Sequence, residues 1–429
     1  MATYSSKKYP SGSVTSATLA DGSVVAVDLA DGAVTSAKLN STVDLSGKTV
    51  TYRSIVAGDI ASNAITTAKV AANAVTPAKM ANSGAELGMR NRIINGAMVI
   101  DQRNAGAAVT INAVGIYSVD RWACVARPTG GGVYSAQQVS DAPTGFSNSL
   151  KFTVTTADTS LGTTDYYFAW QKIEGFNTAD LSFGTANAKT VTLSFWVKSS
   201  ITGQFSAFLT NASEVYNQPS AYTVNAVNTW EFKTLTFTGP TSGTWIGATN
   251  GVGLNVGFGL ANGTSLQGTS GVWTTSSVYG STGDVNWMAT NGNTWQVTGV
   301  QLEVGTVATS FDFRPYSNEL ALCQRYFYSC DAKGLYLVGG SASDANGTLV
   351  HPVPLRASPT TTAATINRLT NFAVLDYAGS YTYSAESSVS VNQSAFRYAR
   401  VSGMTWSTGT PLAINPSSGS STITASAEL

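Results

Sequence analysis

Large apolar side chains alternate with small or polar ones in several stretches after residue 84. This period of two is the pattern of a strand whose sheet has one buried face. It is clearest in residues 150–154, 190–198 and 252–260, which are separated by clusters of Gly, Asn and Ser. In residues 296–304 the apolar phase shifts, which predicts a β-bulge near Gly299. The pattern predicts an all-β fold with an antiparallel β-sandwich, or jelly roll, over residues 84–316.

A ten-residue repeat occupies the beginning of the chain. Complete copies stand at residues 20–29, 30–39, 61–70 and 71–80, with a shortened copy at 11–19, and two of them read ADGAVTSAKL and AANAVTPAKM. Each copy has two large apolar side chains, which one unit cannot bury by itself, so such repeats become stable by stacking. Because stacking within one chain buries little, we predict a shaft over residues 11–83 in which several chains share an axis. A flexible linker is the alternative, but a linker has no reason to keep a ten-residue register.

Shorter segments complete the predicted organisation. Residues 40–58 interrupt the repeats and are predicted to form a small β-collar with a hairpin turn at residues 46–48. A helix is predicted over residues 317–327, with Ser317 as its N-cap and Glu319 near its positive end. It belongs to a helical hinge, residues 317–330, which precedes a C-terminal β tip domain, residues 331–429. Residues 1–10 have nothing to bury by themselves and are predicted to become ordered only on a partner.

Composition narrows the class of partner. Only 11% of the residues are charged and the formal net charge is zero, which argues against nucleic acid and anionic membranes, since both are captured by basic patches. No apolar run reaches the roughly 18 residues of a membrane span, so membrane insertion is not expected. The cysteines, Cys124, Cys323 and Cys330, have no metal-ligand spacing. We expect them to be free buried thiols of a chain that folds in a reducing cytoplasm.

The sequence contains little that could support catalysis. His351 is the only histidine, and no nucleophile elbow, P-loop or H-E-x-x-H motif is present. The acidic pair Glu303 and Asp312 could in principle serve glycoside hydrolysis, but sequence spacing says little about the separation of the two carboxylates. We predict that the chain is not an enzyme. Asp120 and Arg121 are predicted to form an ion pair that locks the sandwich. No cofactor is expected; a structural calcium ion stays open, but no D-x-D-x-D run names its ligands.

Aromatic side chains in uncharged surroundings indicate a candidate binding surface. The only charged residue in 234–302 is Asp284, and Trp273, Tyr279 and Trp287 lie there in loop-like sequence among Gly, Asn, Ser and Thr. Sugars stack their C–H faces on aromatic rings and bind neutral donors and acceptors through their hydroxyl groups. A second group of candidates, Tyr377 and Tyr381, lies in the tip domain. The alternative is that these rings are buried in the core or at an interface between chains.

Some motifs resemble those of a known family. Residues 92–98, RIINGAM, are followed by Asp101-Gln102-Arg103 and, later, by Asp120-Arg121-Trp122; residues 300–327 read VQLEVGTVATSFDFRPYSNELALCQRYF. Together they resemble the sandwich domain of bacteriophage tail fibre proteins over residues 84–330, and the ten-residue units resemble the shaft repeats of such fibres. Residues 331–429 carry no resemblance.

The resemblance implies a homotrimeric virion protein whose jelly roll is similar to carbohydrate-binding modules. Such a protein is made in the host cytoplasm, attaches by its N-terminus to another phage tail or baseplate protein, and binds host surface polysaccharide. Weak, multivalent glycan binding would then mediate adsorption. Two alternatives stay open: a purely structural fibre or collar component without receptor binding, and a polysaccharide-degrading tailspike.

Overall fold

The structure is a computed structural model that describes residues 89–331, 336–341, 344–357, 372–376, 379–383, 389–391, 395–399, 411–416 and 422–429. The predicted attachment segment, the repeat shaft and the collar, residues 1–83, lie outside the described residues. Their predictions therefore stand untested.

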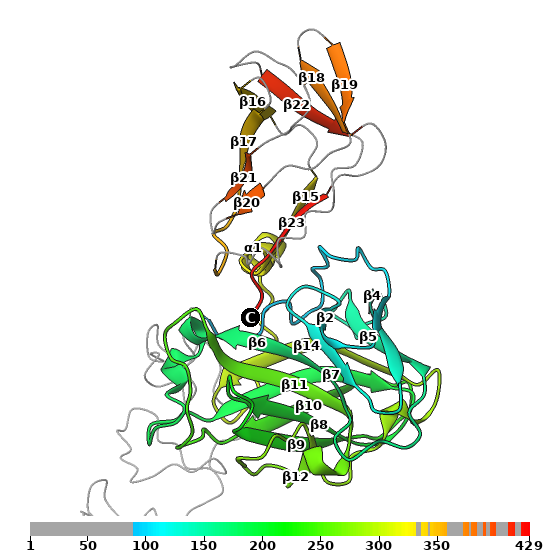
Figure 1. Cartoon of the computed structure of the whole chain (residues 1–429). Coiled ribbons are helices and arrows are strands. Elements are labelled where there is room, and N and C mark those ends of the chain that lie inside the picture. Colours follow the sequence, from blue (N-terminus) through cyan, green and yellow to red (C-terminus); the bar gives the residue numbers. More distant parts are fainter. Residues whose placement is uncertain are drawn as a thin grey trace, which may run out of the picture. The chain divides into compact units, whose positions relative to one another are not determined.

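Two antiparallel six-stranded sheets form a sandwich (Figure 1). Sheet A has the order β1 (Val109–Ile111), β4 (Val133–Val139), β5 (Ser149–Thr156), β14 (Thr294–Val304), β7 (Val191–Ser199), β10 (Glu231–Phe237). Sheet B has the order β2 (Val114–Tyr117), β3 (Ala123–Arg127), β6 (Tyr166–Glu174), β11 (Val252–Asn262), β8 (Gly203–Thr210), β9 (Asn217–Val224). The predicted all-β class and antiparallel sandwich are confirmed.

The alternating apolar residues fill the space between the two sheets. In β7, Val191, Leu193, Phe195 and Val197 are all fully buried in one core cluster, as their spacing predicts. Apolar side chains of β11 and β5 join the same cluster from opposite sheets. Burial of a large apolar side chain stabilises a fold by roughly 1.5–3 kcal/mol, so this shared core holds the sheets together.

The predicted bulge is present in β14. The register between β14 and β7 shifts between Thr298 and Gln301, and Gly299 has a φ of +62°. A Cβ atom at Gly299 would come within 2.7 Å of the Phe146 ring and 3.1 Å of the Trp196 ring. Glycine therefore supplies both the left-handed backbone and the space for two rings to approach the strand.

Short elements connect the strands. They comprise the 3₁₀ helices η6 (Gly175–Asn177), η7 (Ala179–Leu181), η8 (Thr264–Leu266) and η9 (Trp287–Ala289), and the two-residue strands β12 (Gln267–Gly268) and β13 (Gly280–Ser281). β12 and β13 pair in parallel. The loop between them carries both Trp273 and Tyr279, so the pairing fixes the base of a loop with two candidate residues.

The predicted helix is α1, Tyr316–Gln324, which ends three residues earlier than predicted because β15 begins at Phe327. Ser317 as the N-cap was wrong. The cap is Pro315, whose carbonyl oxygen accepts the backbone N–H groups of Asn318 and Glu319. Proline suits the N-cap because its ring fixes φ near the value found there, −52°.

Further strands follow the helix. β15 (Phe327–Asp331) pairs with β23 (Thr422–Ser426). A seven-stranded sheet has the order β19 (Gly379–Tyr383), β18 (Phe372–Asp376), β22 (Pro411–Pro416), β16 (Tyr336–Ser341), β17 (Asp344–Val350), β21 (Ala395–Ala399), β20 (Val389–Val391). Its strands agree with the prediction of a C-terminal β-domain. The predicted domain boundaries, including the hinge, stay predictions.

Hydrogen bonds to Asn95 connect the stretches that resemble tail fibre domains, residues 92–103, 120–122 and 300–327. Its side-chain amide donates to the carbonyl oxygens of Ile100 and Asp120, at 2.8 and 3.0 Å. Its own carbonyl oxygen accepts the indole N–H of Trp122, and its backbone N–H donates to the Glu319 carboxylate of α1. Asn95 is fully buried with a φ of +57°. These motifs therefore have a structural role: they join the segment before β1 to α1.

The ion pair expected between Asp120 and Arg121 is wrong. Asp120 accepts hydrogen bonds from the backbone N–H and side-chain amide of Gln102, at 2.7 and 2.8 Å. Arg121 forms its ion pair with Glu428 and lies 3.5 Å above the Tyr326 ring. The backbone at Arg121 is left-handed, with a φ of +72°, so neighbouring side chains reach different partners.

Candidate functional site

Three loops bring aromatic side chains together at one end of sheet B. Tyr216 comes from the β8–β9 loop, Trp245 from the β10–β11 loop and Trp273 from the β12–β13 loop. Asn217 and Thr274 exchange two backbone hydrogen bonds, at 2.9 and 2.8 Å. This isolated bridge holds two of the loops in register. We call Tyr216, Trp245 and Trp273 the aromatic platform.

The rings of the aromatic platform form a corner. Tyr216 and Trp273 are stacked, with centroids 5.4 Å apart and ring planes 13° apart. Trp245 stands at 87° to Trp273, with centroids 5.6 Å apart, and Phe183 supports it edge-on from behind at 5.0 Å. A stacked pair uses only one face of each ring. Trp245 and Trp273 also pack against the sandwich core, so a ligand can use only the part of each ring that stays exposed.

Hydrogen bonds to the protein hold each ring in place. The indole N–H of Trp273 donates to the carbonyl oxygen of Thr238 at 2.8 Å, and that of Trp245 donates to the carbonyl oxygen of Ser242 at 3.0 Å. The Tyr216 hydroxyl is 2.6 Å from the Ser242 hydroxyl. These polar edges are already satisfied, so the platform offers ring faces to a ligand rather than N–H donors, and it is rigid before binding.

The platform is an open surface, and Glu214, two residues before Tyr216, uses its carboxylate to accept the hydroxyl group of Tyr279. All three rings are half-buried, while Val215 and Val272 beside them are each 51% exposed. A cavity of about 50 Å³ adjoins Trp245, far below the roughly 300–1,000 Å³ that encloses a small molecule. A ligand would therefore lie on this surface, not inside it.

The structure separates the predicted site residues. Trp273 belongs to the platform. Tyr279 is 6% exposed; its ring packs on Phe168 with centroids 4.7 Å apart, and its hydroxyl donates to the Glu214 carboxylate at 2.8 Å. Burial, followed by the charge of Glu214, raises the pKa of Tyr279 well above its usual value. Its ring offers little surface to a ligand.

Trp287 lies in η9 and is fully buried. It meets Tyr134 edge-on, with centroids 5.9 Å apart, which favours the core alternative for this residue. Tyr377 lies outside the described residues. Tyr381 lies in β19, where the backbone alone is described, so its role stays a prediction.

Sequence reasoning did not select Tyr216 and Trp245 as site residues. Trp245 lies in the same uncharged stretch as Trp273, so its surroundings were a usable signal. Tyr216 follows Glu214 and lies outside that stretch, where composition alone could not select it. Their proximity depends on which loops share one end of the sandwich, and that follows from strand order rather than from local sequence.

Glu303 and His351, the residues considered for catalysis, each have neighbours within the fold. No group of three or more His, Cys, Asp or Glu side chains among the described residues could hold a metal ion. Glu303 accepts hydrogen bonds from Gln301 and Thr309, each at 2.8 Å. His351 is buried and meets Tyr328 edge-on. Both therefore have structural partners.

Two further expectations concern thiols and membranes. Cys124 and Cys323 are free and buried, as predicted. Within the described part of the chain, no helix combines the length and the apolar character needed to cross a membrane.

Comparisons with known proteins found no matching family model and no similar curated protein. Among solved structures, the enzymatically active domain of tailspike protein 4 of bacteriophage CBA120 is 13% identical with a TM-score of 0.29; the match covers 50% of this chain and 21% of that one. A family 61 carbohydrate-binding module in complex with β-1,4-galactotriose is 8% identical with a TM-score of 0.26, and 50% of this chain and 99% of the module are covered.

The family 11 carbohydrate-binding module of the Clostridium thermocellum cellulase Lic26A-Cel5E is 14% identical with a TM-score of 0.25, and 47% of this chain and 98% of the module are covered. The match to the tailspike domain covers only 21% of the length of that chain. Similarities at these TM-scores carry no argument about function, which has to come from the side chains.

Proposed function

We propose that this protein is a subunit of a homotrimeric bacteriophage tail fibre that binds neutral polysaccharide on the host surface. The aromatic platform is the proposed glycan site. The fibre belongs to the tail of the virion and is made in the host cytoplasm, and its N-terminal segment attaches to another tail or baseplate protein. The proposal involves no catalysis and no cofactor.

The geometry of the platform is the main observation that supports the proposal of glycan binding. Tyr216 and Trp273 form a stacked pair, and Trp245 stands nearly perpendicular to Trp273. The indole N–H groups of both tryptophans already donate to backbone carbonyl oxygens. The C–H face of a pyranose ring can lie on such a surface, while its hydroxyl groups stay in contact with water and with neutral side chains. The virion role is supported by the resemblance of residues 84–330 to tail fibre domains.

Binding at one such site should be weak. An open platform excludes little water, and a dissociation constant near millimolar corresponds to only about 4 kcal/mol. Several sites on one fibre that engage a repeating polymer together raise avidity by about 10²–10⁴. Because the platform lacks charge, this binding should change little with salt concentration.

The test is binding of the full-length protein to immobilised neutral bacterial polysaccharides. Trp273→Ala and Tyr216→Ala should each weaken binding by roughly tenfold, which corresponds to about 1.4 kcal/mol per site, with a smaller loss of melting temperature than Trp287→Ala causes. Trp230→Ala is the matched control, because Trp230 is also a half-buried tryptophan but lies beside Asp141 and Lys198. It should leave binding intact.

Trp287→Ala separates a ligand contact from a core contact. This variant should lower the free energy of unfolding by about 3–5 kcal/mol, as removal of a buried aromatic side chain does. If the wild-type protein binds no polysaccharide, a purely structural fibre is the better description. Release of oligosaccharides from the polymer would instead identify a polysaccharide-degrading tailspike.

A further inference from the structure

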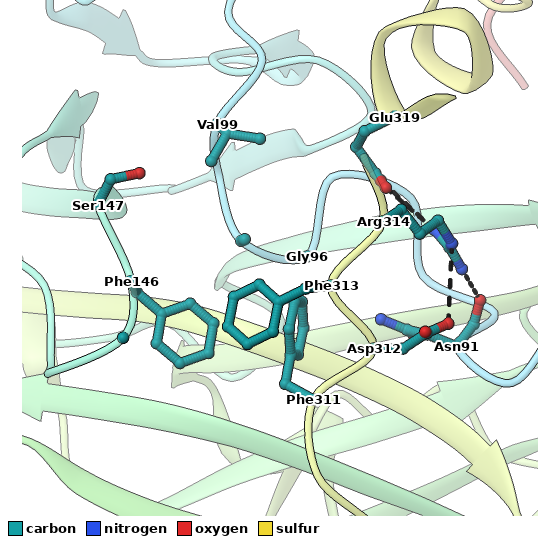
Figure 2. Close-up of a pocket in the computed structure, with 12 residues that line it drawn as sticks. Asn91, Gly96, Val99, Phe146, Ser147, Phe311, Asp312, Phe313, Arg314 and Glu319 are labelled. Carbon is teal, nitrogen blue, oxygen red and sulfur yellow. Dashed lines mark hydrogen bonds and ion pairs between the residues drawn. The ribbon is translucent and has the colours of Figure 1, made fainter. Parts of the chain in front are cut away.

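A concave surface lies at the connection between β14 and α1. Phe146, Phe311 and Phe313 cluster at its base, with ring centroids between 4.8 and 5.2 Å apart. The cavity beside them measures about 440 Å³, and Phe313 is 60% exposed. Figure 2 shows the three rings next to one another, with Val99 and Ser147 across the cavity. We call this the phenylalanine pocket.

The polar groups at the rim of the phenylalanine pocket are occupied by one another. Arg314 donates to the carbonyl oxygens of Ile93 and Asn91 and forms an ion pair with Glu319 at 3.3 Å (Figure 2). Asp312 lies 3.5 Å from Arg90. Two positive and two negative charges cancel, so the open surface carries no net charge and includes the phenylalanine rings.

Apolar surface continues from the pocket across the outer face of sheet A. The bulge at Gly299 lets the Phe146 and Trp196 rings approach the strand from its outer side. Trp196 in turn contacts Phe232, with centroids 5.4 Å apart, and Phe232 is 47% exposed. Large exposed apolar surfaces on soluble proteins mark sites of association.

We propose that the phenylalanine pocket is a docking site for a second copy of this chain, at the contact between neighbouring subunits. This rests on the homotrimeric fibre of the proposed function. The position of the pocket along the chain identifies the occupant. Asn91 lines it and Arg90 pairs with Asp312, which lies between Phe311 and Phe313 in the sequence, so part of the pocket is built from residues that closely follow the predicted shaft.

The ten-residue repeats precede this point directly in the sequence. Each repeat unit has too little apolar surface to be stable by itself, so the predicted shaft joins neighbouring chains. Asn91 of the pocket follows only eight residues after the predicted shaft, residues 11–83. In the proposed trimer this short connection makes another copy of the chain the expected occupant, and the cancelled charges avoid repulsion between identical surfaces.

A photo-reactive phenylalanine analogue tests the proposal in the full-length trimer. p-Benzoylphenylalanine is placed at position 313 in one variant and at position 176 in the other. Phe176 is the matched control because it is a phenylalanine of the same sandwich with 57% exposure, close to that of Phe313. Native mass measurement of both variants gives the oligomeric state before irradiation.

Irradiation should yield a covalent product of twice the chain mass from the variant at position 313, and none above background from the control. A trimer without this product would overturn the docking site while leaving the fibre in place. Cross-linking within one chain would also overturn it, since a segment of the same chain would then fill the pocket. A folded monomer would overturn both the docking site and the trimer, whereas polysaccharide binding by the platform is measured independently.

Discussion

The carboxyl group of Asp120 lies inside the protein. Burial raises its pKa to about 6, although Arg103 and the hydrogen bonds from Gln102 oppose the rise. Between about pH 3.8 and about pH 6 the folded state keeps a proton that the unfolded state has lost. The free energy of unfolding therefore falls as pH rises through this window, and the contribution levels off above it.

Asp120→Asn removes this titration. Relative to the variant, the wild-type protein should lose stability between about pH 4 and pH 6 and change little above that range. Urea unfolding at several pH values measures the difference. Glu231→Gln is a control of opposite sign. Burial raises the pKa of Glu231, but hydrogen bonds from Lys233 and from Asn225 and Ala226 outweigh it and lower the pKa from 4.5 to about 2. The wild-type protein should therefore lose stability relative to this variant as pH falls from about 4.5 to about 2. A wild-type to Asp120→Asn difference that is constant between about pH 4 and pH 6 would contradict the assignment.

Single residues also show where sequence reasoning ends. Trp273 and Trp287 lie in one uncharged stretch with similar neighbours, yet Trp273 is half-buried at the surface and Trp287 is enclosed. The difference arises because η9 directs Trp287 toward Tyr134 of sheet A, while the β12–β13 loop turns Trp273 outward. Composition can select both residues as candidates, but only packing separates them.

At the scale of elements, the segment before β1 docks on β14 through backbone contacts. The N–H of Val300 donates to the carbonyl oxygen of Gly96 at 2.9 Å, and the N–H of Arg92 donates to the carbonyl oxygen of Leu302 at 2.9 Å. A Cβ atom at Gly96 would overlap the carbonyl oxygen of Val300. Only glycine allows this approach, because the obstacle is backbone and cannot rotate away.

Gly96→Ala should therefore lower the free energy of unfolding by about 1–3 kcal/mol, the usual range for overpacking. Gly247→Ala is the matched control, since no atom lies within 4 Å of a Cβ atom at Gly247. Urea denaturation of both variants measures the effect. Equal losses in the two variants would show that the close approach of residue 96 to β14 does not matter.

Elements with strong local patterns could be predicted, and their partners could not. The period of two located β5, β7 and β11, and a phase shift located the bulge in β14. The position of β14 between β5 and β7 depends on pairing between residues far apart in the chain, which no local period records. The helix was predicted too long because residues 325–327 suit a helix locally, yet Phe327 pairs with Ser426 in β15 and β23.

At the scale of the whole molecule, the last residues return to the sandwich. Glu428 forms ion pairs with both Arg103 and Arg121, and the Arg121 side chain is only 1% exposed. Arg356 donates to the carbonyl oxygens of Ala427 and Glu428, at 2.8 and 3.1 Å. A buried guanidinium group without a counter-charge is costly, so this contact ties distant parts of the sequence together.

Glu428→Ala should lower the free energy of unfolding by about 3–5 kcal/mol, because it leaves the Arg121 charge buried and unpaired. Asp141→Ala, which removes the partner of Lys198 at a site where the Asp141 side chain is 49% exposed, should cost about 1 kcal/mol or less. Thermal and urea unfolding measure both. If the two variants lose similar stability, the contact at Glu428 is no stronger than a surface ion pair.

The place of β14 in sheet A has a consequence for protein synthesis. β14 is the last strand of the sandwich in the chain, yet it lies between β5 and β7. A ribosome releases β5 and β7 long before residue 304, and until then each has an unpaired edge that can template pairing with another chain. Nascent chains on one messenger RNA hold such edges close together. A nonsense mutation before residue 294 should therefore produce aggregates rather than a soluble shortened chain, which fractionation of the expressing cells measures.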